Sequence, residues 1–473
     1  MPVFLSRTFD RYALAIAALI FNASVYAAPL SFIGAEDRLY RVSPAMAAAG
    51  AEVDRHRLML DATSGLYLPR LSLHIAPVSY SKTVTVDPNA VLQSLPLTAG
   101  LPSLPLSSFD VTARGTGIRE FAALDWLIYS GGKVQGERRV LDGNMREAEA
   151  ESRQKREELG AVLVERYFGL ALAERVRQVR AAVMAGLTQH REQALKLEQA
   201  GLISKAERLH AEVAFDDARR QLRKAESDRD LAARALGSLL DMDDAPALDT
   251  PLFVMSAPLP PLQDFQQAAR KNNPVFAQLQ AKQQQAAGAG SAARAGWRPQ
   301  VTAFGAYQFN RDPLSLIEPD WVVGMDISFA LFDHIDRSKS VAATERLADR
   351  IRLLGEDADE QIGLLVEKRY RETEIAREQY QLLESSEALA TENLRLRTLA
   401  FREGQATSLD VVDAELMLAK TRTERAAMAY DFTQALSRLL ASCGQSVQFR
   451  DYLARADIHL TQDVGTSPAK ELP

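Results

Sequence analysis

The sequence predicts a mainly α-helical chain with a four-strand β contribution, built as two copies of one structural pattern. Two very long segments without proline predict the helices, and shorter segments of alternating polarity predict the strands. An internal repeat relates the two copies. Of the 473 residues, 47% are hydrophobic and 25% are charged, which is the balance of an ordered protein.

The repeat holds at a constant offset of 203 residues over roughly 115 positions. The matched positions include aromatic residues, a glycine and an Ala-Glu pair: Trp126 with Phe329, Tyr167 with Tyr370, Gly201 with Gly404, and Ala211 and Glu212 with Ala414 and Glu415. Agreement at such different residue types indicates a duplication, and a duplication determines the architecture.

The chain is expected to divide into five segments. Residues 1–27 read as a signal peptide, because Arg7 and Arg11 precede a short apolar run and Ala27 supplies the small residue at a cleavage site. No cysteine lies near that site, so we expect an N-terminus without a lipid anchor. The other segments are the first repeat, a Pro-rich equatorial linker, the second repeat and a polar tail of weak structure: 28–240, 241–261, 262–443 and 444–473.

Each repeat is predicted to begin with a helix, over Glu36–Ser64 and over Leu262–Ala295. Two strands follow in each repeat: Leu68–Ser79 with Ile118–Ile128, and Gln300–Phe309 with Trp321–Phe332. The last is the clearest, because bulky apolar residues alternate strictly with small or polar ones. The first repeat has 27 extra residues within 81–117, a stretch rich in Pro, Leu and Ser that we expect to form a long loop.

Two long helices are predicted over Val134–Ala200 and Arg337–Glu403. Apolar residues in the first recur at an average spacing close to 3.5, which is typical of a left-handed coiled coil. About 67 residues of helix would be roughly 100 Å long. Return helices of about half that length are predicted over Lys205–Leu240 and Ser408–Leu440.

The reversals between outgoing and return helices have clear signals. Gly201 and Gly404 suit the left-handed position that ends a helix. The patterns Ser204-x-x-Glu207 and Thr407-x-x-Asp410 then predict capping boxes that start the return helices. We expect the second box to be the poorer one, because Asp is shorter than Glu.

Four strands cannot close a membrane barrel alone, since the smallest such barrels have about eight. Open sheet edges are not tolerated in lipid, so several chains would have to share one barrel. The signal peptide and the two-faced strands indicate the outer membrane of a diderm bacterium, with the long helices in the periplasm.

This pattern resembles the TolC family of outer-membrane efflux channels, unlipidated type. The matching pieces run in order through both halves, from Glu36 to Gly444: LYLPRLSL, ALDWLIYSGGKV, EQAGLISKAERLHAE, NNPVFAQLQA, WRPQVTAFGAY, FALFDHIDR and REGQATSLDVVDAEL. The resemblance implies a homotrimer that forms a twelve-strand β-barrel in outer-membrane lipid, continued by a periplasmic α-helical barrel. It also implies a periplasmic adaptor and an inner-membrane pump of RND, ABC or MFS type as partners.

Asp410 and Asp413 are three residues apart, so they share one face of the return helix. They match the family's aspartate ring at the periplasmic entrance, and Glu207 is the equivalent acid of the first repeat. The alternative is that Asp410 only caps the helix and Asp413 is only solvated. The family's tethers use a tyrosine and an arginine where this chain has Phe401 and Ala406, so the gate would be held shut differently.

The two turns match the tips where adaptors dock in the family, although reversing the chain is their alternative role: Gly201, Leu202, Ile203 and Ser204, and Gly404, Gln405, Ala406 and Thr407. Aromatic residues near the strand ends would form the girdle of a membrane barrel or pack against the collar: Trp126, Tyr129, Trp321 and Phe332.

The predicted function is a passive export channel and not an enzyme. The six histidines show no metal-ligand spacing, the chain has one cysteine, and no nucleophile–base arrangement is found, so neither a catalytic site, a metal nor a cofactor is expected. The formal charge of −6 disfavours nucleic acid as a partner. Two alternatives are a periplasmic coiled-coil adaptor or stalk, and a surface adhesin or receptor that uses the 81–117 stretch.

Overall fold

The computed structural model describes residues 29–93, 106–243, 247–309, 319–332 and 334–460. The expected signal peptide, 1–27, lies outside the described residues. The described chain forms two compact units. One lies within residues 1–51, 149–277 and 355–473, and the other comprises residues 52–148 and 278–354. We call them the helical unit and the strand-bearing unit.

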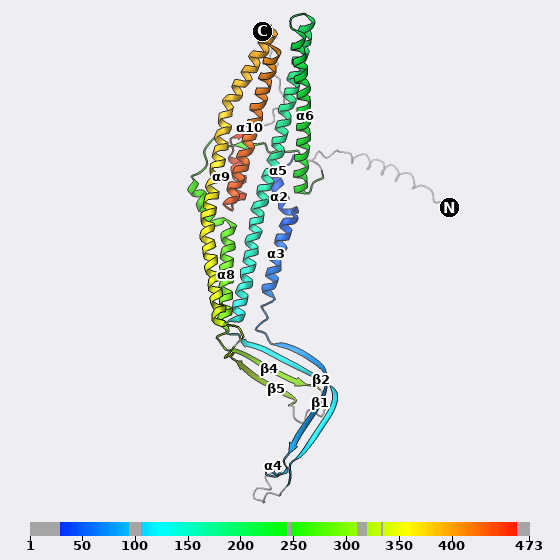
Figure 1. Cartoon of the computed structure of the whole chain (residues 1–473), viewed down its shortest axis with the longest axis vertical. Helices are drawn as coiled ribbons and strands as arrows, with labels where there is room; N and C mark the ends of the chain where they lie inside the picture. The colour runs from blue at the N-terminus through cyan, green and yellow to red at the C-terminus, as the bar shows by residue number, and fades with distance from the viewer. Residues whose placement is uncertain (1–28, 94–105, 244–246, 310–318, 333, 461–473) are drawn as a thin grey trace, which may run out of the picture. The chain divides into compact units, whose positions relative to one another are not determined.

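The strand-bearing unit contains an antiparallel sheet in the order β1-β2-β4-β5. Its strands are β1 (Arg70–Val86), β2 (Phe109–Tyr129), β4 (Gln300–Gln308) and β5 (Trp321–Ser328). Figure 1 shows the four strands side by side, with β1 and β2 much longer than β4 and β5. Each repeat therefore supplies one hairpin, and the two hairpins meet between β2 and β4.

The expected long loop over 81–117 is wrong in most of its described part. β1 continues to Val86 and β2 starts at Phe109, with the short helix α4 (Pro88–Gln93) after β1. Residues 94–105 lie outside the described chain. The strands continue because the β-branched residues threonine and valine alternate along the end of β1 and favour extended backbone. Thr83 and Thr112 also pair through their hydroxyls across the hairpin, 2.9 Å apart. The prolines and leucines of the stretch had suggested a loop throughout.

Each helix predicted before a strand pair is broken once, at an X-Pro step. The first becomes α2 (Phe32–Val42) and α3 (Pro44–Asp61), and the second becomes α7 (Leu262–Asn272) and α8 (Pro274–Ala295). A residue before proline is disfavoured in helical geometry, which accounts for both breaks. The Asn273 side chain occupies the second break, donating to the carbonyl oxygen of Ser442 at 2.7 Å.

In the strand-bearing unit, α8 packs closely against the start of α5 (Lys133–Gln199) at facing glycines. A Cβ added at Gly136 would lie 2.7 Å from the carbonyl oxygen of Gly288. Only glycine permits this backbone approach. Nearby, the Lys282 ammonium lies 2.7 Å from the Glu147 carboxylate, so an ion pair supports the same contact.

The helical unit is built from two antiparallel helix hairpins. α5 returns as α6 (Lys205–Leu240), and α9 (Arg337–Arg402) returns as α10 (Ser408–Ser442). These bounds confirm the predicted helices to within two residues at each end. Figure 1 shows α5 alongside α6 and α9 alongside α10. Within the described residues, no helix is both long and apolar enough to span a membrane.

The core of the helical unit is rich in aromatic rings contributed by both repeats, the linker and the tail: Phe32, Tyr167, Phe168, Phe253, Phe432 and Phe449. The linker strand β3 (Phe253–Val254) pairs with β6 (Ile458–His459). The tail also contains a 3-10 turn, η2 (Ser446–Gln448), and a helix, α11 (Phe449–Arg455). The expectation of a weakly structured tail is therefore wrong for its described part, 444–460, because Phe449 and Tyr452 are buried in this core.

Candidate functional site: the tips of the helix hairpins

Both predicted tips are tight turns with a left-handed glycine. Gly201 and Gly404 each have φ +72, and a Cβ at either would meet nothing within 4 Å. Glycine is therefore required by backbone conformation and not by crowding. Leu202 is exposed at the first turn and Gln405 at the second, so the turns present side chains to solvent.

The cap at the start of α10 is a complete capping box. The Thr407 hydroxyl accepts from the Asp410 amide at 3.2 Å, and the Asp410 carboxylate accepts from the Thr407 amide at 2.9 Å. Hydrogen bonds from Thr407, with help from the charge of Arg397, hold the pKa of Asp410 below its ordinary value. The expectation that this box would be the poorer one is wrong, because the short aspartate reaches its own cap.

The cap at the start of α6 is only half a box. Ser204 Oγ accepts from the Glu207 amide at 3.3 Å, but the Glu207 carboxylate does not return to Ser204. Instead Glu207 Oε2 accepts from the backbone amide of Ser408 at 2.7 Å. The longer glutamate thus reaches an unpaired amide at the start of α10, where a negative charge is favoured. Glu207 links the first hairpin to the second.

His190 of α5 lies beside this link and was not identified from the sequence. Its side chain is 5% exposed, and Nε2 lies 2.7 Å from the Ser408 hydroxyl. Its ring is 4.7 Å from the ring of Phe401. Burial lowers the pKa of His190, against the raising effect of the Glu207 charge. No sequence signal marked it, since a lone histidine in a helix carries no motif.

A small apolar cluster lies beneath the polar link: Ala194, Ala211, Phe401 and Val411, with Leu197, Ile203, Leu394 and Ala406 packed against it. Phe401 is 1% exposed. Phe401 and Ala406, which the sequence resemblance aligns with the tethers of the family, therefore both belong to the apolar packing between the hairpins.

The three predicted gate acids lie in different environments. Glu207 is used between the hairpins, and Asp410 is used in its own cap and lies 3.3 Å from Arg397. Asp413 is exposed, and among the described residues nothing forms a hydrogen bond or ion pair with it. Asp413 is thus the acid that stays available to ions in solution.

α9 and α10 are held together further along by one carboxylate that sequence reasoning missed. Glu387 of α9 accepts from Arg422 Nε at 3.0 Å and from Arg425 Nη1 at 2.8 Å, both on α10. Burial alone would raise the pKa of Glu387, but the two arginines outweigh it and the pKa is lowered. The carboxylate is therefore ionised and acts as a clamp within the second hairpin.

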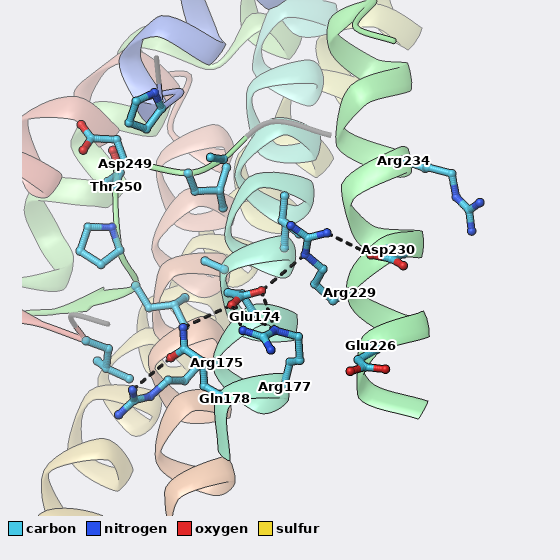
Figure 2. Close-up of a pocket in the computed structure, with 18 of the residues that line it drawn as sticks. Glu174, Arg175, Arg177, Gln178, Glu226, Arg229, Asp230, Arg234, Asp249 and Thr250 are labelled. Atoms are coloured by element: carbon cyan, nitrogen blue, oxygen red, sulfur yellow. Dashed lines mark hydrogen bonds and ion pairs between the residues drawn. The ribbon is translucent and has the colours of Figure 1, made fainter. Parts of the chain in front are cut away.

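The helical unit also has an open cavity of about 1270 Å³ beside α5 and α6, bordered by residues 247–252 (Figure 2). At its centre, Glu174 accepts from Arg177 Nη2 at 2.7 Å and lies 3.4 Å from Arg229. Burial would raise the pKa of Glu174, but the hydrogen bonds from Arg177 outweigh it and the pKa is lowered. Arg229 also contacts Asp230, so the charges at this cavity largely neutralise one another.

In the strand-bearing unit, the expected girdle residues are exposed to different degrees. Trp126 is 43% exposed and Tyr129 is 40% exposed, and the Trp126 indole donates to the carbonyl oxygen of Tyr67 at 2.8 Å. Trp321 pairs with Tyr307 across β4 and β5. Phe332, at 96% exposed, lies beyond the end of β5. No group of histidine, cysteine or carboxylate side chains suited to a metal ion is found within the described part of the chain.

The comparisons agree with this geometry. Residues 266–445 match the family model described as outer membrane efflux protein. No curated protein matches the sequence. Among solved structures, the chain is similar to CusC with a TM-score of 0.72 and 15% identity, covering 87% of this chain and 91% of that one.

The chain is also similar to two further outer-membrane proteins of known structure. VceC of Vibrio cholerae has a TM-score of 0.69 at 14% identity, covering 88% of this chain and 96% of that one. The MtrE outer membrane channel of Neisseria gonorrhoeae has a TM-score of 0.67 at 17% identity, covering 88% and 89%. The resemblance derived from the sequence is thus confirmed: the second half matches the outer membrane efflux protein family, and the described chain has the fold of solved outer-membrane channels of the TolC type.

Proposed function

We propose that the chain is one subunit of a passive outer-membrane export channel. The observation that carries the proposal is a sheet with one continuous apolar face. The β5 residues on this face, Trp321, Val323, Met325 and Ile327, are 62–69% exposed. Their register partners on β4 are Tyr307, Gly305, Ala303 and Val301, so that the face continues across the hairpin. Exposed apolar side chains in rows are what a lipid-facing barrel strand requires.

The opposite face of the same strands is smaller and more polar. It carries Thr302 and Asp326 as direct neighbours, and Ser72 and Asp125 on the first hairpin. Alternation of this kind separates a lipid-facing side from a water-facing side. An adaptor or stalk has no need of such a face, so the channel is the better account of the strands.

Sharing of one barrel between copies follows from the edges of the sheet. β1 and β5 are the outer strands of the described sheet, and an unpaired edge is not tolerated in lipid. Pairing β5 of one copy with β1 of the next removes every edge, and three copies give twelve strands. The family is trimeric, and the homotrimer is accordingly our proposal for this chain.

The long helices also indicate that several copies of this chain assemble into one ring. On α9, four leucine or isoleucine residues spaced by seven are 50–73% exposed: Ile375, Leu382, Leu389 and Leu396. A heptad stripe of this kind is a coiled-coil seam without its partner helix.

The duplication identifies the missing helix. Within the chain, Val179 and Val183 of α5 are buried in one cluster with Val412 and Ala419 of α10. Shifting by the repeat offset carries Val179 to Leu382 of α9 and Val412 to Leu209 of α6, and both of these are exposed. We infer that α6 of one copy packs against the α9 seam of its neighbour, as α10 packs against α5 within one chain.

Partners and energy come from outside the channel. The tips, with residues 201–204 and 404–407 exposed or partly exposed, are the proposed docking positions of a periplasmic adaptor that connects to an inner-membrane pump. The helical part accordingly lies in the periplasm and the strands in the outer membrane. The channel exports what the pump delivers, and the class of pump is set by the partner.

The gate is tested by separating the three acids. Asp413→Asn should lower the preference of the purified channel for cations in planar bilayers, since its carboxylate is exposed. Asp410→Asn serves as the matched control, because its carboxylate is already used by Thr407 and Arg397. Equal loss of cation selectivity in both variants would show that the two acids act together as one ring. Unchanged selectivity in both variants would show that neither acid belongs to the gate.

The channel itself is tested by the native mass and conductance of protein extracted from outer membranes. Three chains per particle and ohmic conductance are expected. A monomer that fractionates with the periplasm would overturn the proposal in favour of the adaptor.

A further inference from the structure

The hairpin of β1 and β2 continues far beyond the rest of its sheet. β1 stays paired with β2 as far as Val86 and Phe109, whereas the pairing of β2 with β4 reaches only from Tyr129 to Phe121. We call the two-stranded part, residues 78–86 and 109–117, the hairpin extension. Figure 1 shows it reaching past the ends of β4 and β5 toward α4.

Where the strands belong to the four-stranded sheet, the exposed apolar residues of β1 have odd numbers. Leu71, Leu73 and Ile75 are 64–74% exposed, and they lie on the face that continues through Gly305 to Val323. The even-numbered face here carries Ser72 and His74. The proposed channel therefore directs the odd face to lipid and the even face toward the barrel axis.

In the hairpin extension the polarity of the two faces is reversed. Each face is named here by its β1 residues, and odd positions of β1 lie beside even positions of β2. The odd face becomes hydroxyl-bearing, with Thr83 beside Thr112 and with the Thr85 hydroxyl donating to Asp110 at 2.6 Å. The even face becomes apolar: Val78, Tyr80, Val84 and Val86 of β1, and Val111 and Phe109 of β2. The register is continuous through Pro77 and Val78, so the reversal is in the sequence and not in the pairing.

The apolar face of the extension is broad. Val84, Val111 and Phe109 are 39%, 50% and 54% exposed. Tyr80 lies across Gly115, since a Cβ there would be 2.6 Å from the tyrosine oxygen. The ring therefore covers the neighbouring strand. Lys82 shares this face, and its long stem lets the ammonium reach water from an apolar contact.

We propose that the apolar faces of the extensions pack against one another in the assembled protein, forming a crown over the outer mouth of the channel. The inference rests on the proposed function. In a closed barrel the even face points toward the barrel axis. The extension lies above the lipid, where its even face still points toward the axis and its hydroxyl-bearing odd face contacts water. Across the axis, each extension therefore faces the even face of another copy of this chain. The apolar side chains are thereby removed from water.

Cysteine cross-linking tests this arrangement. Val84→Cys places a thiol on the apolar face, and Thr83→Cys places one on the hydroxyl-bearing face at the adjoining position. The native Cys443 is buried, and burial raises its pKa to about 12, so it gives little background. Detergent-extracted particles are oxidised with copper phenanthroline and their chain masses compared after denaturation. Each chain carries one introduced thiol, so the product is a two-chain species.

The expected result is a shift of Val84→Cys to the two-chain mass, with Thr83→Cys remaining at one chain. Val111→Cys and its neighbour Thr112→Cys repeat the test on β2, should the first variant fail to assemble. Trimeric particles in which neither apolar-face cysteine cross-links, or in which the control cross-links equally, would overturn the crown while leaving the channel in place. Particles that are not trimers before oxidation would instead overturn the proposed function.

Discussion

The two repeats share their helices and differ at both ends. α6 and α10 start after glycine turns of the same φ, and α5 and α9 differ by one residue in length. At the strand end, β1 and β2 have 17 and 21 residues, whereas β4 and β5 have 9 and 8. At the tips, Glu207 accepts a hydrogen bond from the second hairpin, whereas Asp410 accepts one from the cap residue of its own helix. The helices are thus the common scaffold, and the differences lie at the two ends where the proposed channel would open.

The largest effect is expected on the apolar seam of the long helices, which is buried on α5 and exposed on α9. Leu382→Glu combined with Leu389→Glu would bury two charges in the proposed α9 seam, at a cost of several kcal/mol for each unpaired charge. We expect the particle to fall from three chains to one, measured as native mass in detergent. The control is Thr391→Glu, an exposed α9 position on the opposite side of the helix. An intact trimer in the double variant would contradict the seam.

A smaller effect is expected at the link between the tips. Glu207→Gln weakens a charge-assisted hydrogen bond to the Ser408 amide, of a kind worth roughly 1.5–3 kcal/mol. Hydrogen exchange of the first turn of α10 should become faster, and the channel should open more often. Thr407→Ala removes the cap of the same turn at about 1 kcal/mol without touching the link. Faster exchange with unchanged opening in Glu207→Gln would show that the link does not hold the gate.

The same tip should depend on pH through His190. Because burial lowers the pKa of His190, its contribution to stability is present above the ordinary value of about 6.5. That contribution is lost as the pH falls from there to the lowered value, since the folded tip resists protonation. We expect exchange at the start of α10 to accelerate on acidification, with Glu207 as the carboxylate that partly opposes this. His190→Gln should flatten the dependence; an unchanged profile would assign it to other groups.

The smallest effect should be identical in the two repeats. Gly201→Ala and Gly404→Ala each place a Cβ on a left-handed residue with open space around it, costing about 1 kcal/mol. Thermal unfolding of the two variants should shift by similar amounts. Unequal shifts would reveal a packing role for one turn that its surroundings do not indicate.

Local signals in the sequence were sufficient for the four long helices and for the family resemblance. The bounds of α6 are those predicted, because a glycine turn, a serine cap and a clear helical stretch all lie within a few residues of one another. The two proline breaks were missed although Pro44 and Pro274 were visible, since the apolar pattern continues across them. The strand alternation of β5 was read correctly, but its end at Ser328 was not.

The tips could not be derived from one chain read in order. Whether Glu207 turns back to Ser204 or crosses to Ser408 depends on a neighbour 201 residues away. Burial of His190 depends on Phe401 from the other repeat. Contacts with residues so distant in the sequence do not affect the local spacing of residue types. The same holds for the tail, where Phe449 and Tyr452 are buried although they lie within a polar stretch of sequence.

The paired proline breaks also bear on the origin of the chain. Ser43-Pro44 and Asn273-Pro274 are separated by 230 residues, the same offset that relates Pro69 to Pro299. A break shared at matching positions was present before the halves were joined. The ancestral gene product then had one strand hairpin and one helix hairpin, so that enclosing the proposed twelve-strand barrel would have taken six of its copies in place of three present-day chains. Fusion turned one self-complementary surface into two, and each was afterwards free to change alone.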